Sequence, residues 1–271
     1  MLSSSSLPLI AVDIGNARTK LGLFREHAGD RLPEPVDVFA VDNRGGDFGG
    51  LGDWVDSLDV PSLTWSIGSV NRPAATRLVD WLHDHRPGDT VVLLAASDLS
   101  MRVALPRPDM VGIDRLLDAM AADFLRMPSR PAVVVDVGTA ITVDLVAADG
   151  SFRGGAILPG IAMSARALHE FTDLLPLVDV TELTTPPEPA GTSTDEAMQS
   201  GLFWGAVGSI RELINQMTSR LSEDEESMVA EADVFLTGGA SPAVARLLGS
   251  SAHCVPQLTL AGIALATWAM K

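Results

Sequence analysis

Three short turns in this sequence combine glycine with carboxylate or hydroxyl side chains directly after an apolar run. They are residues 13–16 (DIGN), 136–142 (DVGTAIT) and 237–240 (TGGA). A glycine turn lets backbone N–H groups approach a phosphate, and a carboxylate beside it can hold a hydrated Mg²⁺. Any one of them is also compatible with a plain β-turn, in which Asp and Asn are favoured residues. Three turns of this kind, each following an apolar strand, favour a phosphate-binding role.

The first two turns carry further polar groups. Lys20 lies on the strand that returns from the first turn and could neutralise a phosphate. Thr139 and Thr142 add hydroxyls at the second turn. If the two turns faced each other across a cleft, they would surround a triphosphate and its cations from both sides.

A different constellation, Gly112-Ile113-Asp114-Arg115, opens a predicted helix over residues 113–124. Asp114 falls in the first turn, where the helix dipole favours the ionised carboxylate. An ionised, positioned carboxylate can accept a proton from an alcohol that attacks a phosphoryl group. Arg115 can make a two-pronged contact with a carboxylate or amide. An acidic residue at a helix start followed by a surface arginine would look the same, so the alternative of a purely structural role stays open.

The elements that must position these residues alternate between apolar strands and helices. Residues 10–24 (IAVDIGNARTKLGLF) and 132–146 (AVVVDVGTAITVDLV) both read as a strand, a Gly turn and a second strand. Their aspartates, Asp13 and Asp136, lie about one domain length apart. We therefore predict an α/β protein with an internal duplication. The prolines around position 128 mark the boundary between a first domain, 1–128, and a second, 129–271.

Composition excludes several classes of function. The chain has 271 residues, 46% of them hydrophobic, and a formal net charge of −16. Such an acidic surface repels phosphate backbones and anionic lipid, so we expect no nucleic-acid or membrane partner. The apolar segment 258–270 is shorter than the roughly 20 residues that span a bilayer. The single cysteine, Cys254, allows no internal disulfide, and we expect a cytoplasmic protein.

Seven segments, taken together, resemble the type III pantothenate kinases, bacterial enzymes of coenzyme A synthesis. In chain order they are DIGNARTK, VGIDR, VDVGTAITVDLV, GGAILPG, STDEAMQSGLFWG, FLTGG and VPQLTLAGIALA. The resemblance implies two duplicated ribonuclease-H-like domains of the actin, sugar kinase and acetate kinase superfamily, with a nucleotide cleft between them. It implies transfer of the ATP γ-phosphoryl group to the primary alcohol of pantothenate, giving 4′-phosphopantothenate.

The resemblance also implies roles for individual residues. Asp114 would be the catalytic proton acceptor, and Asp136 would bind a monovalent cation, K⁺ or NH₄⁺, beside Mg²⁺. The family forms homodimers, and we expect this chain to do so. The expected ATP-binding residues are Asp13, Ile14, Gly15, Asn16, Ala17, Arg18, Thr19, Lys20 and Thr139. The expected pantothenate-binding residues are Gly112, Ile113, Asp114, Arg115 and Thr194.

Two positions depart from the family pattern. Ala17 stands where the family usually has Thr after Asp-x-Gly-Asn, which removes a hydroxyl near the phosphates. Arg18 or Thr19 could compensate. Leu105 stands where the family tends to have Tyr, three residues before Pro108. These departures leave two alternatives open: a nucleotide-binding regulator with weak catalysis, and a kinase of the same fold that acts on another small alcohol or acid.

Overall fold

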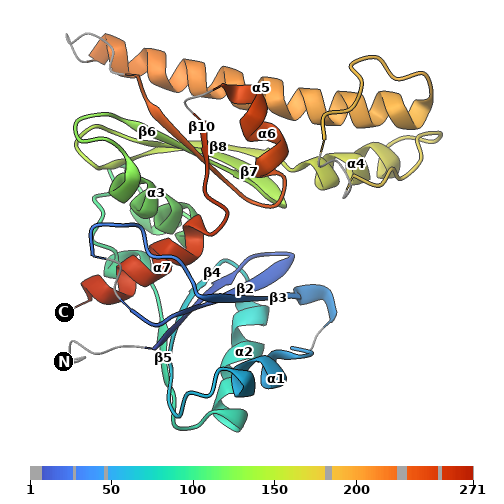
Figure 1. Cartoon of the computed structure of the whole chain (residues 1–271). Coiled ribbons are helices and arrows are strands. Elements are labelled where there is room, and N and C mark those ends of the chain that lie inside the picture. The colour runs from blue at the N-terminus through green and yellow to red at the C-terminus, as the bar shows by residue number, and fades with distance from the viewer. Residues whose placement is uncertain are drawn as a thin grey trace. The chain divides into compact units, whose positions relative to one another are not determined.

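The computed structural model describes residues 8–26, 29–45, 48–180, 185–224, 231–249 and 252–270. The chain forms two compact units, each built on its own five-stranded sheet (Figure 1). The first unit consists of Met1–Leu125 with Gln257–Lys271, and the second of Arg126–Pro256.

The sheet of the first unit has the strand order β3-β2-β1-β4-β5. Strand β2 runs antiparallel to both of its neighbours, whereas β1, β4 and β5 are parallel to one another. The strands are β1 (Leu9–Ile14), β2 (Arg18–Phe24), β3 (Asp37–Asp42), β4 (Thr64–Ser69) and β5 (Thr90–Leu93). The helices are α1 (Leu51–Ser57), α2 (Arg72–His85), α3 (Ile113–Leu125) and α7 (Leu258–Ala269), with short 3₁₀ turns η1 (Asn43–Gly45), η2 (Ala96–Asp98) and η3 (Pro108–Met110).

The sheet of the second unit repeats this topology, in the order β10-β9-β6-β7-β8. Strand β7 is antiparallel to β6 and β8, and β6, β9 and β10 are parallel. The strands are β6 (Ala132–Val137), β7 (Ala140–Val146), β8 (Phe152–Pro159), β9 (Asp233–Thr237) and β10 (Ala252–Cys254). The helices are α4 (Ile161–Glu170), α5 (Thr194–Asp224) and α6 (Ser241–Leu248).

The duplication extends to the central strands. Each begins with four buried residues, then has a half-buried aspartate, Asp13 in β1 and Asp136 in β6, and ends on a buried residue. Central strands of a sheet covered on both faces are expected to be continuously apolar. An aspartate near the end of each is therefore placed where the strand leaves the core. The predicted fold class, an α/β protein of two duplicated ribonuclease-H-like halves, is confirmed.

Helices cover both faces of the first sheet (Figure 1). On one face, Leu51 of α1 and Leu78 of α2 pack in a buried cluster with Ile10 and Trp65. On the other face α7 contacts β1, β2 and β4, and α3 packs along α7. Within the described residues, no helix is both long and apolar enough to cross a membrane.

The position of α7 corrects the predicted division of the chain. Residues 257–271 were expected in the second domain, but they belong to the first unit. Helix α7 is apolar all round, and most of its residues are buried, so it needs cover on every side. Glycines provide the close approach: a Cβ on Gly68 would lie 2.8 Å from Leu117 of α3, and one on Gly262 would overlap the Leu117 carbonyl. Periodicity alone does not say which sheet such a helix joins.

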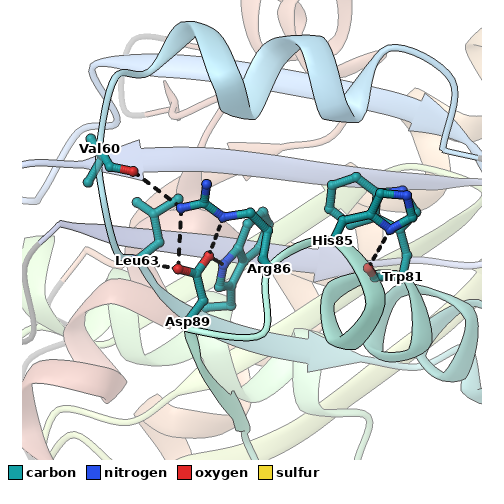
Figure 2. A network of polar contacts seen from close by, with 7 residues as sticks. Val60, Leu63, Trp81, His85, Arg86 and Asp89 are labelled. Atoms are coloured by element: carbon teal, nitrogen blue, oxygen red, sulfur yellow. Dashed lines mark hydrogen bonds and ion pairs between the residues drawn. The ribbon is translucent and has the colours of Figure 1, made fainter.

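A buried ion pair lies at the end of the first unit where strands β4 and β5 begin (Figure 2). The side chain of Asp89 is 2% exposed and that of Arg86 19%. Asp89 accepts hydrogen bonds from Arg86 Nε (2.9 Å), Trp65 Nε1 (2.8 Å) and the Leu63 backbone N–H (3.0 Å). Arg86 also donates to the Val60 carbonyl (3.2 Å). The pair thereby joins the end of α2 to the starts of β4 and β5.

Candidate functional site

The sequence-predicted residues of the first unit gather at the carboxyl ends of β1 and β4. These strands are parallel neighbours, and Asp13 of β1 is in register with Gly68 of β4. In open α/β sheets, ligands bind beyond the carboxyl ends of the strands. The turn 15–17 follows β1 at this edge, and Val70 follows β4, with its N–H donating to the Ile14 carbonyl (3.1 Å). We call this part of the first unit the strand-end edge.

The turn after β1 is a tight connection between antiparallel strands. Gly15 N–H donates to the Arg18 carbonyl (3.0 Å), and a Cβ on Gly15 would lie 3.3 Å from that carbonyl oxygen. Asn16 and Arg18 are exposed, whereas Gly15 and Ala17 are half-buried. The turn is therefore compact and presents one amide and one guanidinium side chain to solvent.

Two of the predicted ATP-binding residues turn inward. Ile14 and Thr19 are both fully buried, and the Thr19 hydroxyl donates to Asn43 Oδ1 (2.7 Å). Neither side chain can contact a ligand from this position, so Thr19 does not replace the hydroxyl that Ala17 lacks. Asp13 and Lys20 face each other across the β1–β2 ladder and remain partly exposed. Their predicted role toward a phosphate stays a prediction.

Asparagines outside the predicted set hold the turn. Asn43 Nδ2 donates to the Gly15 carbonyl (2.8 Å), and the Asn43 N–H donates to the Ala17 carbonyl (2.8 Å). Asn71 Nδ2 lies 3.4 Å from the carbonyls of Gly15 and Asn16. Asn71 also caps α2, since its Oδ1 accepts from Ala74 N–H (3.2 Å). An Asn before Arg-Pro is a helix-start signal that could have marked Asn71. Asn43 has no comparable local signal.

The helix start at Asp114 reaches the same edge. A Cβ on Gly112 would lie 3.6 Å from Val70 Cγ1 and 2.6 Å from Asp114 Oδ1, so glycine leaves the space that the carboxylate occupies. Asp114 Oδ1 accepts a hydrogen bond from the Arg115 backbone N–H (2.8 Å). Because Val70 binds the end of β1, the structure brings Asp114 to the edge that carries the turn after β1.

The electrostatics of Asp114 differ from the prediction. The helix start was expected to favour the ionised carboxylate, but burial raises the pKa of Asp114 above its ordinary value. The Arg115 N–H and the Arg115 charge lower the pKa by a smaller amount. Desolvation therefore outweighs the helix start. A carboxylate with a raised pKa is a stronger proton acceptor, and such shifts are typical of catalytic acids and bases.

In the second unit, two glycines lie against the Asp136 side chain, and a third lies against the turn that follows it. Asp136 is in register with Thr237 of β9. A Cβ on Gly238 would overlap Asp136 Oδ1, and one on Gly138 would lie 3.4 Å from it. A Cβ on Gly160 would overlap the Gly138 carbonyl. Gly238 has φ +90°, which disfavours any other residue. Because glycine has no side chain, backbone atoms surround the Asp136 carboxylate. Such an arrangement allows a phosphate to approach closely.

Hydrogen bonds fix the three turns to one another. Gly160 N–H donates to the Thr139 carbonyl (3.1 Å), and Ala240 N–H donates to the Val137 carbonyl (3.3 Å). Ser241 Oγ donates to the Gly238 carbonyl (2.7 Å). Thr139 itself is exposed at the tip of its turn. Its hydroxyl is thus presented to solvent at the carboxyl end of the second sheet.

The carboxylates at the strand ends suit a cation that takes most of its ligands from water and from substrate phosphates. Among the described residues, no three His, Cys, Asp or Glu side chains cluster as a metal site. Asp13 and Asp136 each supply a single carboxylate at a strand end. Mg²⁺ commonly keeps several waters and binds one or two carboxylates plus substrate phosphates. The residues present therefore fit a cation that arrives with a phosphorylated substrate.

Thr194 lies at the start of α5, in the second unit, and is exposed. Ser193 caps this helix, since its Oγ accepts from Glu196 N–H (3.2 Å). Glu196 in turn reaches back to the Thr192 N–H (2.7 Å) and hydroxyl (2.6 Å), one residue further than in a standard capping box. These bonds lower the pKa of Glu196. A joint role for Thr194 and Asp114, which lies in the first unit, stays a prediction.

Comparisons of this chain with known protein sequences find the same family. A family model described as type III pantothenate kinase matches residues 9–216. The type III pantothenate kinase of Rubrobacter xylanophilus is 35% identical over 273 residues, covering 94% of this chain and 95% of the relative. That of Chlorobaculum parvum is 33% identical over 268 residues, covering 97% and 96%. That of Parafrankia sp. is 33% identical over 268 residues, covering 95% and 96%.

Proposed function

The chain belongs to the type III pantothenate kinase family, and from this premise we propose that it phosphorylates pantothenate with ATP. The product would be 4′-phosphopantothenate, and the reaction the first step of coenzyme A synthesis in the cytoplasm. The observation that carries the proposal is Asp114: a carboxylate with a raised pKa, at a helix start, on the edge that also holds the turn after β1. Family and geometry support the same reaction from independent directions.

In this reaction the hydroxyl oxygen of pantothenate attacks the γ-phosphorus of ATP. The bond between that phosphorus and the β,γ-bridging oxygen breaks, and ADP leaves with the electron pair. Asp114 accepts the proton of the attacking hydroxyl. Catalysis of this kind depends mainly on positioning and on neutralising charge. Arg115 is proposed to hold the pantothenate carboxylate by a two-pronged contact. Gly112 and Ile113 in the first unit, and Thr194 in the second, are further residues proposed to bind pantothenate.

Each unit carries residues that are proposed to bind ATP phosphates, at its own strand-end turn. In the first unit, the backbone of the turn after β1, with Asp13 and Lys20, would face the phosphates. In the second unit, Thr139 and the glycine-lined surroundings of Asp136 would do so. Mg²⁺ would neutralise phosphate charge, and K⁺ or NH₄⁺ at Asp136 would add a second cation. Asp13 and Asp136 are the carboxylates proposed to orient these cations.

One observation favours the alternative of a weakly catalytic nucleotide-binding regulator. Ala17 lacks a hydroxyl, and the neighbouring Thr19 hydroxyl is buried against Asn43. A lost hydrogen bond to a charged group costs about 1.5–3 kcal/mol. This cost would weaken ATP binding without altering Asp114.

The decisive test is ADP formation from Mg·ATP, with and without pantothenate, in K⁺ and in Na⁺ buffer. We expect ADP only when pantothenate is present and faster turnover in K⁺. ADP formation at the same rate with and without pantothenate, or ATP binding without any turnover, would contradict the kinase proposal and favour the regulator. Pantothenate-dependent turnover at equal rates in K⁺, NH₄⁺ and Na⁺ would remove the cation role of Asp136 alone.

We also propose that the second unit carries a homodimer interface. Five large apolar side chains are exposed within one stretch of chain that covers β8, α4 and the following loop: Ile157 (64%), Met163 (46%), Phe171 (86%), Leu174 (87%) and Leu177 (59%). Exposed apolar residues that gather in one patch mark interaction surfaces, and these five are close together in the sequence. Sedimentation velocity should give a dimer for the wild type and a monomer for the double variant Phe171→Glu/Leu174→Glu. A monomeric wild type would contradict the interface.

A further inference from the structure

Asn43 contacts the turn after β1 at three points, although it lies at the end of a different strand. Its side-chain Nδ2 donates to the Gly15 carbonyl (2.8 Å), and its Oδ1 accepts from the Thr19 hydroxyl (2.7 Å). Its backbone N–H donates to the Ala17 carbonyl (2.8 Å). One residue therefore binds the start of the turn, its end and the strand β2 that follows it. Both functional groups of the amide are used in doing so.

The surroundings hold Asn43 in place. The carbonyl of Asn43 accepts from Arg77 Nη2 of α2 (3.3 Å). Asn43 begins η1, directly after β3, and β3 pairs with β2 along Arg18–Asp42 to Leu23–Asp37. The position of the asparagine is thus fixed by a sheet strand on one side and by a helix on the other. Its side chain transmits that rigidity to the turn.

The turn needs such support because its own residues provide little. Gly15 has high conformational freedom, and Ala17 contributes no polar side chain. Ordering a flexible binding loop on association costs free energy, which a preorganised loop avoids. The contact from Asn71 to the Gly15 carbonyl is longer, at 3.4 Å, so Asn43 makes the shorter bond to the same atom.

We propose that Asn43 is a positioning residue for ATP binding: through Gly15, Ala17 and Thr19 it holds the phosphate-facing turn in its binding conformation. The inference rests on the proposed function, because it takes the turn to be the ATP-phosphate site. Asn43 acts through the turn and does not itself contact substrate. It should therefore affect ATP binding and leave pantothenate binding unchanged.

The test measures dissociation constants for a non-hydrolysable Mg·ATP analogue and for pantothenate by calorimetry, together with steady-state constants. Asn43→Ala should weaken analogue binding about tenfold, the effect of one to two net hydrogen bonds. Thr19→Val should weaken it less, and the double variant should resemble Asn43→Ala, because the two residues share a bond. The KM for ATP should rise while kcat at saturation changes less than twofold.

Asn43→Asp is a second variant, which tests the proposal if Asn43→Ala does not fold. It keeps an acceptor for Thr19 but places an anionic oxygen beside the Gly15 carbonyl, so analogue binding should weaken more than in Asn43→Ala. Trp65→Phe is the matched control, since it removes a buried hydrogen bond to Asp89 in the same unit. It should lower the unfolding temperature and leave both dissociation constants unchanged.

Distinct outcomes separate the inference from the proposed function. If the wild type binds the analogue and pantothenate, and Asn43→Ala and Asn43→Asp retain wild-type analogue affinity, the inference is overturned while the proposed function stands. Equal weakening of both ligands, or equal weakening by Trp65→Phe, would show a general structural role and also overturn it. A wild type that binds neither ligand would overturn the proposed function, and the inference with it.

Discussion

Replacing Asp114 with asparagine is expected to lower turnover about a hundredfold or more, while ATP binding and folding stay intact. The amide keeps the size of the side chain and can still accept the Arg115 N–H bond (2.8 Å) through its oxygen. It cannot accept the proton of the attacking hydroxyl. Steady-state assays should show the loss in kcat, and calorimetry should show unchanged affinity for the Mg·ATP analogue. Turnover within a few-fold of wild type would remove Asp114 from the role of proton acceptor.

The pKa of Asp114 adds a pH signature to this prediction. Turnover of the wild type should fall as the pH drops through the raised pKa, because the acceptor becomes protonated. The sign for stability is opposite to that of a salt-bridged carboxylate. A raised folded-state pKa means that the folded protein binds this proton more tightly than the unfolded chain does. The resulting stabilisation of the fold is complete below the unfolded-state pKa of about 3.9, and it is lost as the pH rises through the folded-state pKa.

Asp114→Asn should therefore be at least as stable as the wild type at neutral pH, because it removes a partly buried charge. The advantage should shrink as the pH falls through the raised pKa toward the unfolded-state pKa of about 3.9, because the wild-type carboxyl becomes protonated. Denaturant unfolding at both pH values measures the difference. A variant that is clearly less stable than the wild type at neutral pH would show that the carboxylate stabilises the fold, contrary to its raised pKa.

Asp89→Asn is expected to lower the free energy of unfolding by roughly 3–5 kcal/mol, the usual result of removing one partner of a buried ion pair. The side chain of Arg86 would lose its counter-ion, and the amide nitrogen would face donors from Arg86, Trp65 or Leu63 (Figure 2). Urea unfolding followed by tryptophan fluorescence would report the change, since Trp65 donates to Asp89.

Asp109→Asn provides the matched control. Asp109 pairs with Arg107 at 2.8 Å, close to the 2.9 Å of the Arg86–Asp89 pair, but the side chains are 70% and 62% exposed. Arg107 lowers the pKa of Asp109 through this bond, yet water screens the pair. The midpoint of unfolding should not shift measurably. If Asp89→Asn also leaves the midpoint unchanged, burial of the Arg86–Asp89 pair does not contribute to stability.

The paired strands could be predicted because they carry their signal locally. Residues 10–24 and 132–146 show apolar runs on both sides of a glycine turn, and β1–β2 and β6–β7 form there. Asp114 could be placed at a helix start for the same reason. By contrast, the sheet on which α7 packs is decided by contacts between residues far apart in the sequence. An apolar helix sequence does not indicate which sheet that is.

The environment of the site could not be predicted, because burial is a property of the assembled fold. Thr19 reads as a turn hydroxyl in the sequence, but β3 brings Asn43 over it and leaves it fully buried. The pKa of Asp114 rises because burial removes water from the carboxylate, whereas the sequence shows only the helix start. Spacing thus identified candidate groups, and packing decided what they can do.

The most direct test of the central claim is to identify the phosphorylated product. Wild-type protein would be incubated with Mg·ATP, K⁺ and pantothenate, and phosphorus-31 NMR and mass spectrometry would follow the mixture, with Asp114→Asn beside it. The kinase account predicts a phosphate monoester on pantothenate, formed in equal amount to ADP and almost absent with Asp114→Asn. ADP accompanied by inorganic phosphate, or by no new monoester, would contradict it.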